Sequence, residues 1–257
     1  MRTPIKLGVL GIIVAALLTA VVERRNTRQN MNNGRWHVIL IGASIGQGWH
    51  LAEWPTRVNA PGFTAESIAV WQFDKSEAVE EVLLRPGRKF RPTRTYLRSL
   101  FQPPPTKPDI VILKECSSYF PGNPRVYQDS VRDWVRQLRA HNIQVILATV
   151  APVTRTREER DPGKQESLLA YNRWVREYAR EQGLPVLDLE SAVRTQEGGS
   201  YLRDEFTSGD GTHLNATAYA VLDRTLQSTL CEIHPVSGCD PQALGALPAS
   251  VHPENKP

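Results

Sequence analysis

Three side chains of this 257-residue chain have the types that acyl-transfer chemistry needs. Ser44 lies in "GASIGQGW", directly after the apolar run "HVILI", and Asp210 and His213 lie far downstream in "SGDGTHLN". The spacing of the last two lets the carboxylate accept a hydrogen bond from one imidazole nitrogen while the other nitrogen faces a serine hydroxyl. The three residues therefore predict a nucleophile, a general base and a group that orients the base.

The surroundings of Ser44 fit a reactive hydroxyl, although they also have a structural explanation. Gly42, Gly46 and Gly48 let the backbone turn tightly from a strand into a helix. The hydroxyl would then stand at a helix N-terminus, where free N–H groups favour developing negative charge. The alternatives are a glycine-rich turn at Ser44 and, in "DGTH", a turn whose aspartate caps a helix.

The elements that must position these residues follow from the hydrophobic pattern. Five apolar runs of strand length stand at 36–42, 67–73, 109–115, 144–150 and 185–189. Their continuous hydrophobicity predicts strands that are covered on both faces, as in a parallel sheet. Helical patterns alternate with them, so we expect an open α/β sheet with helices on both faces and a ligand site at the carboxyl ends of the strands.

Helix ends can be predicted from three residues. Asn123, followed by Pro124, is expected to cap the helix that runs to about residue 142, and Asn215 is expected to cap the last helix. Gly183 is a natural C-terminal stop for the helix between them.

Taken together, the two motifs resemble those of the SGNH (GDSL-type) hydrolases. Gly42, Ser44 and Gly48 match that family's first block, and Asp210 and His213 match its last block, just before the C-terminal helix. The resemblance covers about residues 36–230. It implies a three-layer α/β/α sandwich with a central, mostly parallel five-stranded sheet of the flavodoxin-like type, and a serine hydrolase activity.

The middle blocks of the family are altered in this chain. Such enzymes usually place a glycine after the second strand and an asparagine after the third, both of which donate to the oxyanion. No glycine stands near Lys75, and Ser118 is nearest to the expected asparagine, with Asn123 further on. The candidates for binding the oxyanion are therefore the N–H of Ser44, Ser118 and Asn123, although the role of helix cap is the favoured explanation of Asn123.

"GASIG" also matches the Gly-x-Ser-x-Gly nucleophile elbow of the α/β-hydrolases. The position argues against that family, because only one strand precedes Ser44 and the acid and base share one loop.

These observations predict an esterase, lipase or deacetylase that cleaves the acyl ester of a small molecule or lipid, or an O-acetyl group on a glycan, through Ser44, His213 and Asp210. Two alternatives stay open. One is an O-acyltransferase that uses the same triad on a glycan, and the other is a catalytically impaired surface-binding domain of the same fold.

The chain divides into three parts. Residues 1–35 contain 16 uncharged residues between basic flanks, which predicts an export signal or a membrane anchor, with a buried core helix as the alternative. Residues 36–239 form the expected hydrolase domain, and 240–257 are expected to be a disordered tail. We therefore expect a membrane-anchored or exported protein that contacts the membrane through its N-terminal segment.

Other partners are constrained by charge and by residue spacing. The net charge of +4 comes from dispersed arginines, so nucleic acid is not expected. The histidines have no zinc-ligand spacing and no Walker loop appears, so no metal or cofactor is expected. Cys231 and Cys239 either pair or stay as thiols, Cys116 is expected in the core, and the oligomeric state is left open.

Overall fold

A central sheet organises the chain in the computed structural model, which describes residues 34–70, 75–84, 106–195, 200–236 and 239. Its strands are β1 (Trp36–Gly42), β2 (Phe63–Ala69), β3 (Ile110–Lys114), β4 (Gln144–Ala148) and β5 (Val186–Leu187). Their order is β2-β1-β3-β4-β5, and every pairing is parallel. The carboxyl ends of β1 and β3 are therefore neighbours at one edge of the sheet.

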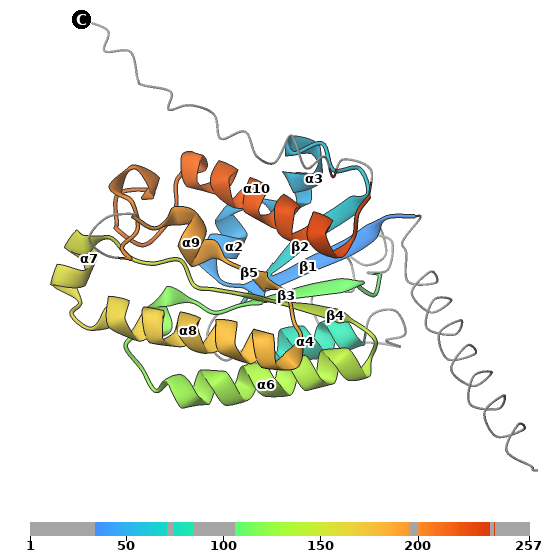
Figure 1. The fold of residues 1–257 in the computed structure, drawn as a ribbon, viewed down its shortest axis with the longest axis horizontal. Helices are drawn as coiled ribbons and strands as arrows, with labels where there is room; N and C mark the ends of the chain where they lie inside the picture. The colour runs from blue at the N-terminus through green and yellow to red at the C-terminus, as the bar shows by residue number, and fades with distance from the viewer. Residues whose placement is uncertain (1–33, 71–74, 85–105, 196–199, 237–238, 240–257) are drawn as a thin grey trace, which may run out of the picture.

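Helices cover both faces of the sheet (Figure 1). One face carries α4 (Lys75–Leu83), α6 (Pro124–Ala140) and α8 (Lys164–Gln182), which share one apolar core. The other carries α2 (Ser44–Gly48), α3 (Trp54–Arg57), α9 (Leu189–Val193) and α10 (Ala216–Ile233), which share a second core. Four short elements complete the description: α7 (Arg155–Arg160) and the 3-10 helices η1 (Leu51–Glu53), η2 (Ser117–Tyr119) and η3 (Asp204–Phe206). The predicted three-layer α/β/α fold is confirmed.

The second strand lies several residues before its predicted position at 67–73. In the structure β2 begins at Phe63, and it lies at the edge of the sheet. Phe63 and Ala65 are buried whereas Thr64 and Glu66 are partly exposed, so the strand alternates instead of being apolar throughout. A search for continuous apolar runs misses such an edge strand. The other edge strand, β5, is also shorter than predicted.

The predicted helix ends are confirmed. The side chain of Asn123 accepts a hydrogen bond from the N–H of Arg125 at the start of α6, and that of Asn215 accepts one from Ala218 at the start of α10. Gly183 ends α8 in a left-handed conformation with φ of 62°.

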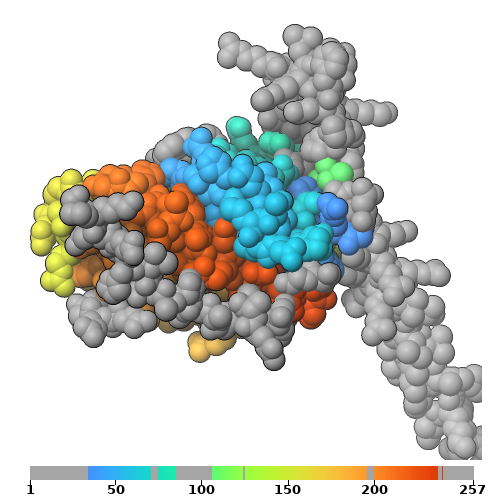
Figure 2. Space-filling model, turned by 90° about the horizontal axis from the view of Figure 1, so that it is seen from above, coloured from blue at the N-terminus to red at the C-terminus, as the bar shows by residue number. Residues whose placement is uncertain are grey.

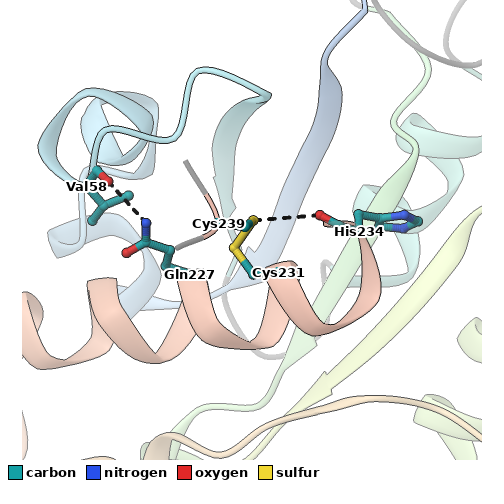
Figure 3. Close-up of a disulfide and its surroundings, with 5 residues drawn as sticks. All are labelled: Val58, Gln227, Cys231, His234 and Cys239. Atoms are coloured by element: carbon teal, nitrogen blue, oxygen red, sulfur yellow. Dashed lines mark hydrogen bonds between the residues drawn. A yellow bond between two sulfur atoms is a disulfide. The ribbon is translucent and has the colours of Figure 1, made fainter. Parts of the chain in front are cut away.

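The structure decides between a disulfide and two free thiols for the last two cysteines. Cys231 and Cys239 form a disulfide, which ties the segment after α10 back onto that helix (Figure 3). Cys116 is a buried thiol at the end of β3, as expected.

The two ends of the chain largely fall outside the described residues. The predicted signal or anchor lies within 1–35, of which only 34 and 35 are described, and the whole predicted tail at 240–257 is outside. Among the helices in the described ranges, none combines the length and the apolar character that a membrane span requires.

A buried aspartate fastens α10 to the segment that follows Ser44. The Asp223 carboxylate accepts hydrogen bonds from Trp49 Nε1 at 2.7 Å and from Arg57 Nε at 2.8 Å and Nη2 at 2.9 Å. Its backbone carbonyl accepts one from Trp54 Nε1. This contact raises the pKa of the Arg57 guanidinium. The network joins the helix that follows His213 to the helices that follow Ser44.

Asp223→Ala should destabilise the fold, because it leaves the Trp49 N–H without its acceptor and the Arg57 charge without its partner. A partly buried pair of this kind is worth about 2–4 kcal/mol, which corresponds to a melting temperature lower by roughly 5–15 °C. Thermal unfolding followed by circular dichroism measures the shift. Glu232→Ala, at an exposed position of the same helix, is the matched control and should change the melting temperature little. Equal melting temperatures for the two variants would contradict this account.

Candidate active site

Ser44 is the first residue of α2, and only Ala43 separates it from the strand β1. Helical hydrogen bonding begins with the N–H of Gln47, which donates to the carbonyl of Ala43. The N–H groups before it, including that of Ser44, have no acceptor within the helix. The half-buried Ser44 hydroxyl therefore stands beside a backbone donor at the carboxyl edge of the sheet.

Close packing against α10 explains Gly48. A Cβ at this position would lie 2.5 Å from the hydroxyl of Tyr219. That hydroxyl donates to the carbonyl of Ile45, and burial raises the pKa of Tyr219 to about 12, so it stays a donor at neutral pH. Gly48 thus lets α10 reach the short helix that carries Ser44.

Asp210, His213 and Ser44 form one continuous hydrogen-bonded chain. The Nδ1 of His213 lies 2.5 Å from Asp210 Oδ2, and its Nε2 lies 2.9 Å from Ser44 Oγ. Figure 2 looks onto the face covered by α10 and shows the blue and cyan surface of the segment after β1 beside the orange surface of the segments near α10. The fold thus brings together the three residues that the sequence singles out.

The local turn fixes the Asp210 carboxylate as an anion. Its Oδ1 accepts hydrogen bonds from the N–H groups of Thr212 and His213, at 2.9 and 2.8 Å. Burial acts to raise the pKa of Asp210, but these bonds and the contact with the imidazole outweigh it and lower the pKa to about 2. An ionised carboxylate accepts the Nδ1 proton, which leaves the Nε2 lone pair directed at the serine hydroxyl.

The loop that carries Asp210 and His213 is held by its neighbours. The carbonyl of Gly211 accepts a hydrogen bond from the N–H of Thr154, just before α7. Gly211 has φ of 78°, and a Cβ there would lie 2.5 Å from Thr154 Oγ1 and 2.8 Å from Arg157 Cβ. A side chain at this position would push the acid and base away from Ser44.

The two further oxyanion candidates have different surroundings. Ser118 is exposed in η2, in the loop after β3, and its Oγ lies 3.1 Å from Cys116 Sγ. Because β3 pairs with β1, this loop starts at the same edge of the sheet as Ser44. Asn123 lies beyond it and uses its side-chain oxygen to cap α6. Ser118 and the N–H of Ser44 stay the candidates, and the known contact of Asn123 is structural.

Sequence reasoning missed a buried cluster of charges at the end of β3. Lys75 of α4 donates to the Glu115 carboxylate at 2.5 Å and to the carbonyl of Lys114 at 2.7 Å. All three side chains are almost completely buried. The sequence signal that could have revealed this cluster is the "KE" that ends an otherwise apolar strand. Lysine and glutamate are rarely buried unless they are paired, so their presence at the end of a buried strand indicates a charge pair.

Within the described ranges, no group of three or more histidine, cysteine, aspartate or glutamate side chains could hold a metal ion.

A protein-family profile matches most of the chain. Residues 40–221, more than two thirds of the chain, match the profile of the GDSL-like Lipase/Acylhydrolase family. No curated protein sequence matches.

Solved structures share the fold at low sequence identity. A GDSL-like lipase from Bacteroides thetaiotaomicron aligns with a TM-score of 0.56 at 17% identity, over 82% of this chain and 98% of that one. The lipase/acylhydrolase from Enterococcus faecalis aligns with a TM-score of 0.51 at 16% identity, over 75% and 93%. These likenesses show the shared fold, and the match to the family profile shows that the chain belongs to the GDSL-like lipase/acylhydrolase family and is an ester-bond hydrolase.

Proposed function

We propose that this protein hydrolyses carboxylic esters through Ser44, His213 and Asp210, acting on an acyl or lipid ester or on an O-acetyl group of a glycan. The observation that carries the proposal is the unbroken chain of contacts from Asp210 Oδ2 through the imidazole to Ser44 Oγ. This is the arrangement in which a serine hydroxyl becomes a nucleophile at neutral pH.

Each residue has one role in the reaction. Ser44 Oγ bonds to the ester carbonyl carbon while its proton passes to His213 Nε2, and a tetrahedral oxyanion forms. The bond to the alcohol oxygen then breaks, and the imidazolium returns the proton to the leaving alkoxide. Water attacks the acyl-Ser44 by the same route and releases the acid. Asp210 keeps the imidazole in the productive tautomer and stabilises its charged form.

Backbone donors at the sheet edge would hold the oxyanion. The N–H of Ser44 is one, and the loop after β3, which contains Ser118, supplies the others. A preorganised donor of this kind contributes about 3–4 kcal/mol to the stability of the transition state.

The exposure of the site favours hydrolysis over acyl transfer. About half of the Asp210 and His213 side chains is accessible, with relative exposures of 49% and 46%. Water therefore reaches the base that must activate it, whereas a transferase has to exclude water from the acyl-enzyme. The intact contacts among Ser44, His213 and Asp210 also argue against a domain that only binds.

We also propose that the protein is exported or anchored with this domain outside the cytoplasm. The disulfide between Cys231 and Cys239 supports this, because such bonds persist mainly in oxidising compartments. The 16 uncharged residues between basic flanks near the N-terminus agree with it.

The activity can be tested with the full chain and a panel of substrates. p-Nitrophenyl acetate, a p-nitrophenyl ester with a longer acyl chain and an O-acetylated glycan should separate the substrate classes by kcat/KM. A fluorophosphonate probe should label Ser44, and peptide mass spectrometry identifies the labelled residue. A chain that is folded but neither turns over any ester nor takes up the probe would refute the proposed function.

A further inference from the structure

The last residue of β3 is a lysine whose side chain lies inside the protein. Lys114 is 2% exposed. Side chains alternate along a strand, so it shares a face with Ile110 and Ile112, which pack in the core beneath α2 and α10. A Cβ at Gly42 would lie 3.7 Å from Lys114 Cβ and 3.9 Å from its Cδ. The stem of Lys114 therefore packs against the residue two positions before Ser44.

The Lys114 ammonium is poorly compensated for a buried charge. Its Nζ donates at 2.8 Å to the carbonyl of Glu115, which is its only hydrogen bond in the described part of the chain. The Glu115 carboxylate is instead engaged by Lys75. Two cations thus share one anion, and burying an ammonium with so few partners is costly. A hydrophobic side chain would fill this position at lower cost, so stability does not explain the lysine.

The carbonyl to which Lys114 donates is that of Glu115, in the first peptide of the loop that follows β3 beside Ser44. In that peptide the carbonyl of Glu115 and the N–H of Cys116 are conjugated, so a cationic donor on the oxygen makes the N–H a stronger donor. Among the hydrogen bonds of the described residues, none uses the N–H of Cys116, Ser117 or Ser118 as its donor. Within the described residues, the loop therefore presents N–H groups without an acceptor where the family resemblance leads us to expect an asparagine.

We propose that Lys114 is a positioning residue of the oxyanion site, which holds and polarises the Glu115–Cys116 peptide so that the N–H groups after β3 bind the oxyanion formed when Ser44 attacks. Lys75 supports the same loop by binding the carbonyl of Lys114 and the carboxylate of Glu115. This inference rests on the proposed function, because it assigns a role within that reaction.

The charge on Lys114 makes the inference testable by pH. Burial lowers the pKa of Lys114 to about 8, with Lys75 acting in the same direction and Cys116 and Glu115 opposing. The titratable groups that act on it are Lys75 of α4 and Glu115 and Cys116 of its own loop. Gly42, against which its stem packs, and Ala148, its partner on β4, carry no charge. The ammonium is therefore present at pH 7 and is lost as the pH rises through about 8.

Steady-state kinetics of the full chain with a p-nitrophenyl ester, from pH 6 to pH 10, test the proposal. Lys114→Met removes the charge and keeps most of the length of the side chain. It should lower kcat at pH 7 by about 10- to 30-fold with KM changed less than about twofold, since the polarised N–H acts in the transition state. The wild type should lose activity above pH 8, and Lys114→Met should lack this alkaline decline. Lys114→Arg, which keeps a charge that does not titrate in this range, should retain most of the activity without the decline.

Lys107→Met is the matched control. Lys107 lies on the order of 20 Å away, beyond the amino end of β3, and its ammonium binds the carbonyl of His141. This variant should keep the wild-type kcat and pH profile. A wild type without the alkaline decline, or a folded Lys114→Met that keeps both kcat and the decline, would overturn the role of Lys114. If Ser44→Ala turned over as fast as the wild type, the proposed function itself would fail instead.

Discussion

Replacing Ser44 with alanine should lower kcat for ester hydrolysis by at least about 10⁴-fold. The substitution removes the hydroxyl oxygen that lies 2.9 Å from His213 Nε2, and no acyl-enzyme can form without it. The residual rate would come from binding and from the oxyanion donors, which the substitution leaves in place. Initial rates with p-nitrophenyl acetate, measured at enzyme concentrations high enough to detect the remaining activity, give the ratio of the wild-type and variant kcat values.

The double variant Ser44→Ala/His213→Ala gives a stricter test. Nucleophile and base act as one unit, so removing both should cost about as much as removing either one. Ser130→Ala is the control, because its hydroxyl binds the carbonyl of Val126 on α6, on the opposite face of the sheet from α2. If the single losses multiplied in the double variant, Ser44 and His213 would be acting independently and the triad would be wrong.

The catalytic residues near the two ends of the domain could be predicted, because each of the two motifs is local in sequence. Ser44 follows a strand directly, and Asp210 and His213 occupy one turn, so only one long-range fact was needed. A parallel sheet supplies it, since the carboxyl ends of its strands meet at one edge. The helix caps at Asn123 and Asn215 were predictable for the same reason, because their contacts span two or three residues.

The features that could not be predicted from the sequence depend on contacts between elements that lie far apart along the chain. Lys75 reaches Glu115 across forty positions, and the "KE" that ends the apolar strand does not indicate which residue will pair with Glu115. The position of β2 was wrong because one strand at the edge of a sheet keeps a half-exposed face, which breaks the apolar run. The pairing of Cys231 with Cys239 depended on how the chain returns to α10. Residues whose partners lie far along the chain are the hardest to predict from a single sequence.

Two polar networks on the α10 side of the sheet differ in how fully their charges are compensated, and we therefore expect them to differ in function. Asp223 compensates Arg57 and two tryptophan N–H groups, so its bonds are complete and it serves stability. Among the described residues, Lys114 makes one hydrogen bond with an ammonium that offers three donors, so its charge stays available to its surroundings. Substituting the first should change mainly the melting temperature, and substituting the second should change mainly kcat.

Asp210→Asn should lower kcat by about 10⁴-fold while leaving the fold intact. Oδ1 of Asp210 accepts from the N–H groups of Thr212 and His213, and the asparagine oxygen can accept both bonds in its place. The amide nitrogen must then take the place of Oδ2, which lies against His213 Nδ1. Because that nitrogen donates, the imidazole is held with its proton on Nε2, and it can no longer accept the proton of Ser44.

The wild-type rate should not reveal a titration of this carboxyl near neutral pH. Hydrogen bonds lower the pKa of Asp210 to about 2, so it is ionised throughout the range in which the kinetics are measured. The pairing stabilises the fold above the ordinary pKa of an aspartate, and that contribution disappears as the pH falls towards 2. Asp204→Asn, an exposed position in η3 with the same change of charge, should keep the wild-type kcat and serves as the control. If Asp210→Asn, with an unchanged melting temperature, stayed within about tenfold of the wild type at pH 7.5, the carboxylate would not be what orients His213, and another acceptor for Nδ1 would have to be found.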